Sequence, residues 1–220
     1  MMKTKAIVFD AYGTLFDVNS AAEKCKNKIG TKWEAFANFW RTTQLEYTWL
    51  RSLMKRHKNF WEITEDSLDK SMRVFNINKS MKNELLNLYK ILSPYPEVRE
   101  VLENLKKKNL KLAILSNGTP DLLNELVVSN KLNNLFDDLF SIEEVKVYKP
   151  DSRVYEIPIK KYKIKANEII FLSANTWDIS GGGNYGYNSI WVNRTNSEFD
   201  ILDYQPKNEI NSLTQLLDKF

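Results

Sequence analysis

The chain has 220 residues, of which 43% are hydrophobic and 27% are charged. This composition is typical of a folded protein, and the length favours one hydrophobic core with a smaller inserted unit over two independent enzyme domains. The formal net charge is only +4, and lysines such as Lys106 and Lys160 are scattered along helical segments rather than gathered with aromatic residues. We therefore expect no nucleic-acid partner.

Cysteine and histidine are scarce, which leaves several kinds of site without support. Cys25 is the single cysteine and His57 the single histidine, so the sequence favours neither an internal disulfide nor a multi-histidine metal site nor a Ser-His-Asp triad. No apolar N-terminal segment with a cleavage site precedes the first strand, and no apolar run approaches the ~20 residues of a membrane span. We expect a cytoplasmic protein with no membrane partner.

The first strand is predicted from the apolar run 6–9, which ends on Asp10 and is followed by a glycine-containing loop. A short β-branched and aromatic run of this kind indicates a buried parallel strand. Ligands of open α/β sheets bind at the carboxyl ends of such strands, where Asp10 falls. Taken alone, an aspartate in this position more often caps the following turn.

Residues 17–92 contain no strand candidate and show helical apolar spacing, as at Phe36 and Trp40. The segment 93–96, with its two prolines, then breaks the helical pattern. We therefore predict two units, a core domain formed by residues 1–16 and 93–220 and an inserted helical cap subdomain formed by residues 17–92.

Beyond residue 96 the sequence alternates between helix and strand without an internal repeat. Such alternation predicts the α/β class, with a doubly wound parallel sheet of the Rossmann-like kind. Pro158 is expected to kink or interrupt its helix. The expected helices cover 97–108, 120–130 and 152–162, and the expected strands cover 110–115, 139–142, 168–172 and 189–193.

Polar residues follow several of these strands or lie in equivalent loops. Because the carboxyl ends of neighbouring parallel strands lie side by side, residues far apart in the sequence should meet there in one cleft. Each residue singly is more ordinarily a helix cap or a surface lysine, so the convergence is the main argument for a site. The residues concerned are Asp10, Ser116, Asn117, Lys149, Ser173, Asn175 and Asp178.

Four motifs, at 10–14, 116–118, 149–150 and 173–178, resemble those of the haloacid dehalogenase superfamily. They occur in the family order and span nearly the whole chain, with the helical cap inserted after the first. Most members are phosphatases that bind magnesium and carry a second aspartate two residues after the first. Tyr12 occupies that position here, so a general acid and metal ligands are poorly supplied. We expect neither a metal nor an organic cofactor.

The cap segment 39–51 and the last motif are similar to those of one branch, the type II L-2-haloacid dehalogenases. The resemblance implies that Asp10 is the nucleophile, that Arg41 and Asn117 receive the leaving halide, and that Ser116 holds the substrate carboxylate. It also implies a set of residues that order the catalytic carboxylates and the water, namely Lys149, Ser173, Asn175 and Asp178, with Thr14 and Tyr155 in less defined catalytic and substrate-binding roles.

Physical chemistry agrees with these roles. A dry cleft removes the hydration shell of a carboxylate nucleophile and fixes its approach. Lys149 nearby would keep Asp10 ionised despite burial. Arg41 would meet the charge on the departing halide, where a donor is worth roughly 3 kcal/mol of barrier.

A short alkyl chain needs an apolar wall around the reacting carbon. The candidates for it, and for other substrate contacts, are Ala11, Tyr12, Leu45, Phe60 and Trp177, although Leu45 and Phe60 fit core packing equally well. The run 181–183 of three glycines lacks the lysine and hydroxyl residue of a phosphate loop. We interpret it as a place of close packing and expect the helix after Asp178 to begin late.

The function predicted from these observations is hydrolysis of short L-2-haloalkanoic acids to D-2-hydroxy acids through an ester on Asp10. The substrate would be the small-molecule 2-halo acid alone. The family resemblance and the four cap tryptophans, Trp33, Trp40, Trp49 and Trp61, also suggest a homodimer with the cap at its interface. Two alternatives stay open, a phosphatase of the same superfamily and a catalytically silent binding protein on this fold.

Overall fold

The core is an α/β domain built on one six-stranded sheet, seen in a computed structural model that describes residues 4–219. The strand order is β3-β2-β1-β4-β5-β6, and every neighbouring pair is parallel. The predicted fold class is thereby confirmed. The strands are β1 (Ala6–Phe9), β2 (Lys111–Ser116), β3 (Asp138–Ser141), β4 (Ile169–Ser173), β5 (Asn188–Val192) and β6 (Asn208–Ile210).

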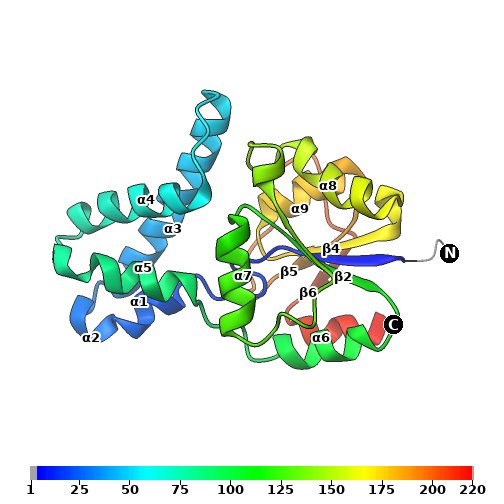
Figure 1. Ribbon diagram of the computed structural model, residues 1–220, viewed down its shortest axis with the longest axis horizontal. Helices are drawn as coiled ribbons and strands as arrows, with labels where there is room; N and C mark the ends of the chain where they lie inside the picture. The colour runs from blue at the N-terminus through cyan, green and yellow to red at the C-terminus, as the bar shows by residue number, and fades with distance from the viewer. Residues whose placement is uncertain (1–3, 220) are drawn as a thin grey trace.

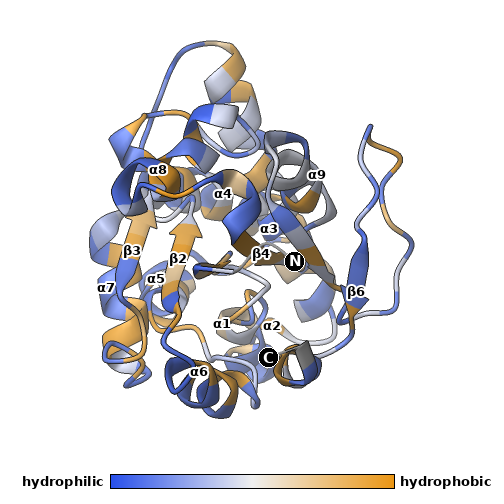
Figure 2. Cartoon of the chain, turned by 90° about the vertical axis from the view of Figure 1, so that its right-hand side faces the viewer, coloured by the Kyte–Doolittle hydropathy of each residue, from blue (hydrophilic) through white to orange (hydrophobic). Residues whose placement is uncertain are grey.

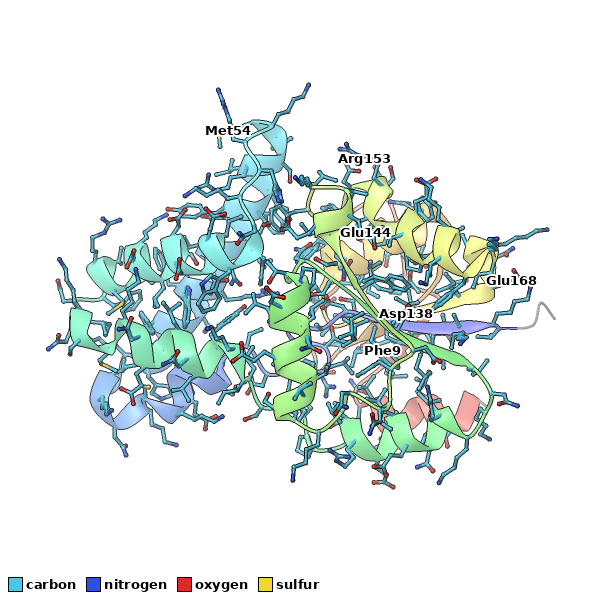
Figure 3. All side chains as sticks on the ribbon, in the orientation of Figure 1. Phe9, Met54, Asp138, Glu144, Arg153 and Glu168 are labelled. Carbon is cyan, nitrogen blue, oxygen red and sulfur yellow. The ribbon has the colours of Figure 1, made fainter. Side chains whose placement is uncertain are left out.

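Helices cover both faces of this sheet, as Figure 1 shows, with α8 and α9 on one side and α6 and the C-terminal segment on the other. Central strands are apolar because both of their faces are buried, and β1 is buried at all four positions. Phe9, labelled in Figure 3, lies at the end of β1 inside this core. The helices are α6 (Val98–Lys106), α7 (Pro120–Ser129), α8 (Ser152–Tyr162) and α9 (Thr176–Tyr185).

The segment 17–92 is helical throughout its regular structure and lies beside the core (Figure 1). The chain crosses between the two parts at two adjacent places, where the Asp17 amide donates to the Ser93 carbonyl and the Tyr95 amide to the Leu15 carbonyl. The helices are α1 (Ser20–Lys24), α2 (Lys26–Ile29), α3 (Trp33–Leu53), α4 (Phe60–Val74) and α5 (Lys82–Lys90).

Three local predictions were wrong or incomplete. The helix α8 continues through Pro158, whose neighbours Val154 and Ile157 are buried, so packing of this face outweighs the missing N–H. The strand β6 and the short 3-10 helix Leu213–Lys219 were not predicted. Figure 2 shows β6 as largely hydrophilic, in contrast to β2 and β3, so it carries little of the apolar pattern that reveals a strand.

The third difference concerns α9, which was expected to begin late, after Asp178, but begins at Thr176. The run of glycines therefore lies inside the helix, where it does provide close packing. A Cβ atom on Gly181 would lie 2.7 Å from Cβ of Pro150, and one on Gly182 would lie 2.8 Å from the Phe171 ring. Because α9 starts early, Asp178 falls in its first turn, where the helix dipole favours a negative charge.

Candidate active site

Asp10 lies directly after β1, where its backbone amide still donates to the Leu172 carbonyl of the neighbouring strand. Its carboxylate is held by several donors. Oδ2 accepts from Thr14 Oγ1 at 3.0 Å, from Asn175 Nδ2 at 2.9 Å and from Ser173 Oγ at 3.5 Å, and Oδ1 accepts from Lys149 Nζ at 3.1 Å. The residue is only 5% exposed. This carboxylate is therefore fixed in orientation and largely shielded from bulk water.

Lys149 lies between two carboxylates and is fully buried. Its Nζ is 3.1 Å from Asp10 Oδ1 and 2.8 Å from Asp178 Oδ2. Burial alone would lower the pKa of Lys149, but the negative charges of Asp10 and Asp178 outweigh burial and raise it. The lysine is therefore a cation at neutral pH.

Asp178 has the opposite balance. Burial raises the pKa of its carboxyl to about 6, with the nearby charge of Asp10 acting in the same direction and Lys149 opposing both. Tyr155 Oη donates to Asp178 Oδ1 at 2.7 Å. The Tyr155 side chain is fully buried and packs against Phe171 and Tyr187. This packing holds the Tyr155 hydroxyl in contact with Asp178.

The end of β2 contributes two buried polar residues. Ser116 Oγ accepts from the Gly118 amide at 3.1 Å, which shapes the turn after the strand. Asn117 Oδ1 accepts from the backbone amide of Lys149 at 3.2 Å. Asn117 therefore fixes the loop that carries the lysine, a contact that the sequence analysis did not anticipate.

Arg41 brings a cation from the cap to the loop after Asp10. It lies on α3, and its Nη2 donates to the Tyr12 carbonyl at 3.3 Å. Its Nη1 donates to Gln44 Oε1 at 3.0 Å. Together, Asp10, Asp178, Lys149 and Arg41 give the site two negative and two positive groups from four separate parts of the chain.

Aromatic side chains surround the loop after Asp10. The Tyr12 ring is buried and packs between Phe60, with ring centroids 5.2 Å apart, and Tyr89, stacked at 5.7 Å. Trp177 meets Trp49 of the cap edge to face at 5.5 Å. Ala11 is buried, and its carbonyl accepts the amides that form the loop. Leu45 is half-buried on α3, one turn after Arg41.

Cap and core meet over Lys149. Tyr148 Oη donates to the Lys58 carbonyl at 2.7 Å, and the Tyr148 amide donates to Ser52 Oγ at 3.2 Å. A groove of about 490 Å³ runs along this junction. It is lined from the cap by Trp49 and Leu53 and from the core by Tyr148, Pro150 and Trp177.

Sequence reasoning missed Gln44 and Tyr89. Both are buried in the cap, and both lie within hydrogen-bond or stacking distance of residues at the site. The only signal for Gln44 was its position three residues after Arg41 on a predicted helix, which places the two on one face. Nothing local in the sequence marks Tyr89.

Two general properties of the described residues bear on the site. Within residues 4–219, no three His, Cys, Asp or Glu side chains come together as a set that could hold a metal ion. Over the same range, no helix combines the length and apolar character needed to cross a membrane.

The fold and the site define a hydrolase of the haloacid dehalogenase-like class, and residues 4–186 match that family. The chain belongs to the haloacid dehalogenase-like hydrolase family. Its curated relatives include the (S)-2-haloacid dehalogenase of Pseudomonas sp. (strain YL), 40% identical over 218 residues that cover 98% of this chain and 94% of the relative. The (S)-2-haloacid dehalogenase 4A of Burkholderia cepacia is 38% identical over 214 residues, covering 96% of this chain and 93% of the relative.

Solved structures agree with these relatives. The chain is similar to the L-2-haloacid dehalogenase from Xanthobacter autotrophicus with chloropropionic acid covalently bound, with a TM-score of 0.91 and 30% sequence identity. That match covers 98% of this chain and 97% of the other. The predicted family is thereby confirmed.

One carboxyl group of the site should titrate with a pKa of about 6, since Asp178 is buried beside a second carboxylate. Carbon-13 NMR of labelled aspartate measures this titration, and it should disappear in Asp178→Asn. In Lys149→Met the midpoint should move upward, because two buried carboxylates then share no counter-charge. A midpoint in Lys149→Met at or below that of the unaltered protein would contradict the role given to the lysine.

Proposed function

We propose that the protein hydrolyses short L-2-haloalkanoic acids to D-2-hydroxy acids and halide through an ester on Asp10. The observation that carries the proposal is the buried Asp10 carboxylate, held by Lys149, Thr14 and Asn175. An arginine from the cap donates to the carbonyl of the nearby Tyr12. The names of the relatives, (S)-2-haloacid dehalogenases, and the covalently bound chloropropionic acid in one of them support the same chemistry.

In the first step, an oxygen of Asp10 attacks the carbon that carries the halogen. The new C–O bond forms as the carbon–halogen bond breaks, and the bonding pair leaves with the halide. A carboxylate reacts poorly in water, but here it is 5% exposed and fixed by several donors, so neither a hydration shell nor free rotation opposes the attack. Arg41 and Asn117 receive the halide, and Ser116 holds the substrate carboxylate.

In the second step, water attacks the carbonyl carbon of the Asp10 ester. Asp178, with a pKa near 6, is mostly ionised at neutral pH and can take the proton of that water. Lys149 and Tyr155 hold its carboxylate in place. Thr14, Ser173 and Asn175 donate to the oxyanion that forms on Asp10. As the oxyanion collapses, the bond between the Asp10 carbonyl carbon and the substrate oxygen breaks, and the leaving alkoxide takes the proton from Asp178 to give the hydroxy acid.

The substrate's alkyl chain would lie against the aromatic residues of the cap junction. Tyr12 and Phe60 are in ring contact with each other, and Trp177 contacts Trp49. We assign the alkyl chain to a wall formed by Ala11, Tyr12, Leu45, Phe60 and Trp177.

For this function we divide the chain into a core domain, residues 1–16 and 93–220, and a cap subdomain, residues 17–92.

Phosphatase activity is the alternative closest in chemistry. It would need a general acid two residues after Asp10, where Tyr12 stands instead. Burial, together with Tyr89, raises the pKa of Tyr12 well above its ordinary value, and the ring is enclosed by Phe60 and Tyr89. A weakly acidic, enclosed phenol is a poor proton donor to a leaving alcohol. The observations therefore favour the dehalogenase over both the phosphatase and a silent binding protein.

The direct test is release of halide from L-2-chloropropionate, with the configuration of the product determined. We expect chloride and D-lactate in equal amounts, because one inversion occurs at the carbon and the second step leaves it untouched. Turnover should persist in excess chelator, since Lys149 supplies the positive charge beside Asp10. Absence of chloride release, or phosphate release from a generic ester only with magnesium, would overturn the proposal.

Two substitutions separate the two steps. Asp10→Asn should abolish halide release, because a neutral amide does not displace halide. Asp178→Asn should release about one halide per site and then stop, because the ester forms but is hydrolysed slowly. Mass spectrometry should then find the acyl adduct on the Asp10 peptide of Asp178→Asn. Undiminished steady turnover in either variant would refute the assigned roles.

We also propose that the protein is a cytoplasmic homodimer. The support is the family resemblance and the exposed apolar end of α3, where Leu50, Leu53 and Met54 are 50%, 79% and 59% exposed. Figure 3 shows Met54 at the projecting tip of this helix. Light scattering at micromolar concentration should give twice the mass of one chain, and a monomer mass would contradict the homodimer.

A further inference from the structure

A small polar cluster inside the cap is in hydrogen-bond contact with Arg41. The cluster consists of Gln44 on α3, Thr64 on α4 and Tyr89 on α5. All three are buried, and Gln44 is 1% exposed. None of them has a role in the chemistry described above, yet Gln44 accepts directly from the Arg41 guanidinium at 3.0 Å.

The orientation of the Gln44 amide is fixed by Thr64. The Thr64 hydroxyl gives its one proton to the Phe60 carbonyl at 2.7 Å, so it can only accept from Gln44. Gln44 Nε2 is the donor, at 2.7 Å. The amide oxygen must therefore be the atom that faces Arg41, and the assignment of N and O follows from the hydrogen bonds themselves.

Tyr89 links this cluster to the core. Its hydroxyl lies 3.2 Å from Gln44 Oε1 and 3.0 Å from Gln44 Nε2, and its ring stacks on Tyr12 at 5.7 Å with an angle of 16° between the planes. Arg41 in turn donates to the Tyr12 carbonyl. The cap thus contacts Tyr12 twice, because Tyr89 stacks on its ring and Arg41 donates to its carbonyl. Gln44 is hydrogen-bonded to both Tyr89 and Arg41.

The geometry points to Gln44 as a positioning residue that holds the Arg41 guanidinium toward the halide, with Tyr89 and Thr64 holding Gln44. This inference rests on the proposed function. The neutral character of Gln44 is the essential point. An amide oxygen orients the guanidinium and leaves its charge available, whereas a carboxylate in the same place would pair with that charge and compete with the departing halide.

The test compares Gln44→Glu, which keeps the shape and adds a charge, with Gln44→Met, which removes the acceptor. Halide release is measured in single turnovers with enzyme in excess, from L-2-chloropropionate and L-2-bromopropionate. For chloride the rate should fall about tenfold to a hundredfold in Gln44→Glu, and by less in Gln44→Met. The rate of bromide release should fall less, because the better leaving group needs less stabilisation. The ratio of the bromide-release rate to the chloride-release rate should therefore rise.

Thr48→Val is the matched control. Thr48 lies one turn further along α3, is equally buried, and its hydroxyl donates only to the Leu45 carbonyl of its own helix among the described hydrogen bonds. Its rates and ratio should stay near those of the unaltered protein. Tyr89→Phe keeps the ring against Tyr12 and removes the hydroxyl, so it gives a second test with little risk to folding. It should raise the ratio as Gln44→Met does.

An unchanged ratio in both Gln44→Glu and Tyr89→Phe, in proteins that melt cooperatively, would overturn the inference. Equal losses for the two halides would do the same, because they would indicate general damage to the cap. Failure of the unaltered protein to release any halide would instead refute the proposed function, so the two ideas fail separately.

Discussion

The Lys149 ammonium between Asp10 and Asp178 is the interaction on which the rest of the site depends. Two buried carboxylates repel each other, and a buried ammonium in hydrogen-bond contact with both offsets that repulsion. The sheet supplies the framework for this contact. Asp10 follows β1, Ser173 ends β4, and Asp178 lies in the first turn of α9. Asn117, directly after β2, accepts from the backbone amide of the lysine.

The division of labour between core and cap follows from the same charges. The core holds two carboxylates and one lysine, so its buried set carries a net negative charge that disfavours an anionic substrate. Arg41 from the cap supplies the missing cation, and it reaches the core at the Tyr12 carbonyl. The contacts of Trp49 with Trp177 and of Tyr148 with Lys58 hold the cap where that arginine is useful. The cap is therefore part of the electrostatic design of the site as well as its cover.

The sequence predicted those features that leave a local signature. Apolar runs that end on polar residues predicted β1, β2 and β4 and the side chains that follow them, because a buried parallel strand needs such a pattern. The strand β6 was not predicted, because two of its three residues are exposed and it lacks an apolar run. The early start of α9 escaped because helix propensity counts against glycine, whereas contact with Phe171 and Pro150 requires it. Gln44 and Tyr89 escaped because their roles depend on how three cap helices pack together.

Tyr12 shows how one position turns a common fold toward a different chemistry. A carboxylate there would add a third negative charge beside Asp10 and Asp178 and would call for a metal ion. A tyrosine adds none, and its ring fills the space between Phe60 and Tyr89 with apolar surface. The loop after Asp10 thereby becomes dry on the side where an alkyl carbon would approach, while its carbonyl still receives Arg41. Attack of a carboxylate on carbon needs a path free of water, and departure of the halide needs a cation near the leaving group. Tyr12 contacts Phe60 and Tyr89, which provide the apolar surface, and Arg41, which provides the cation.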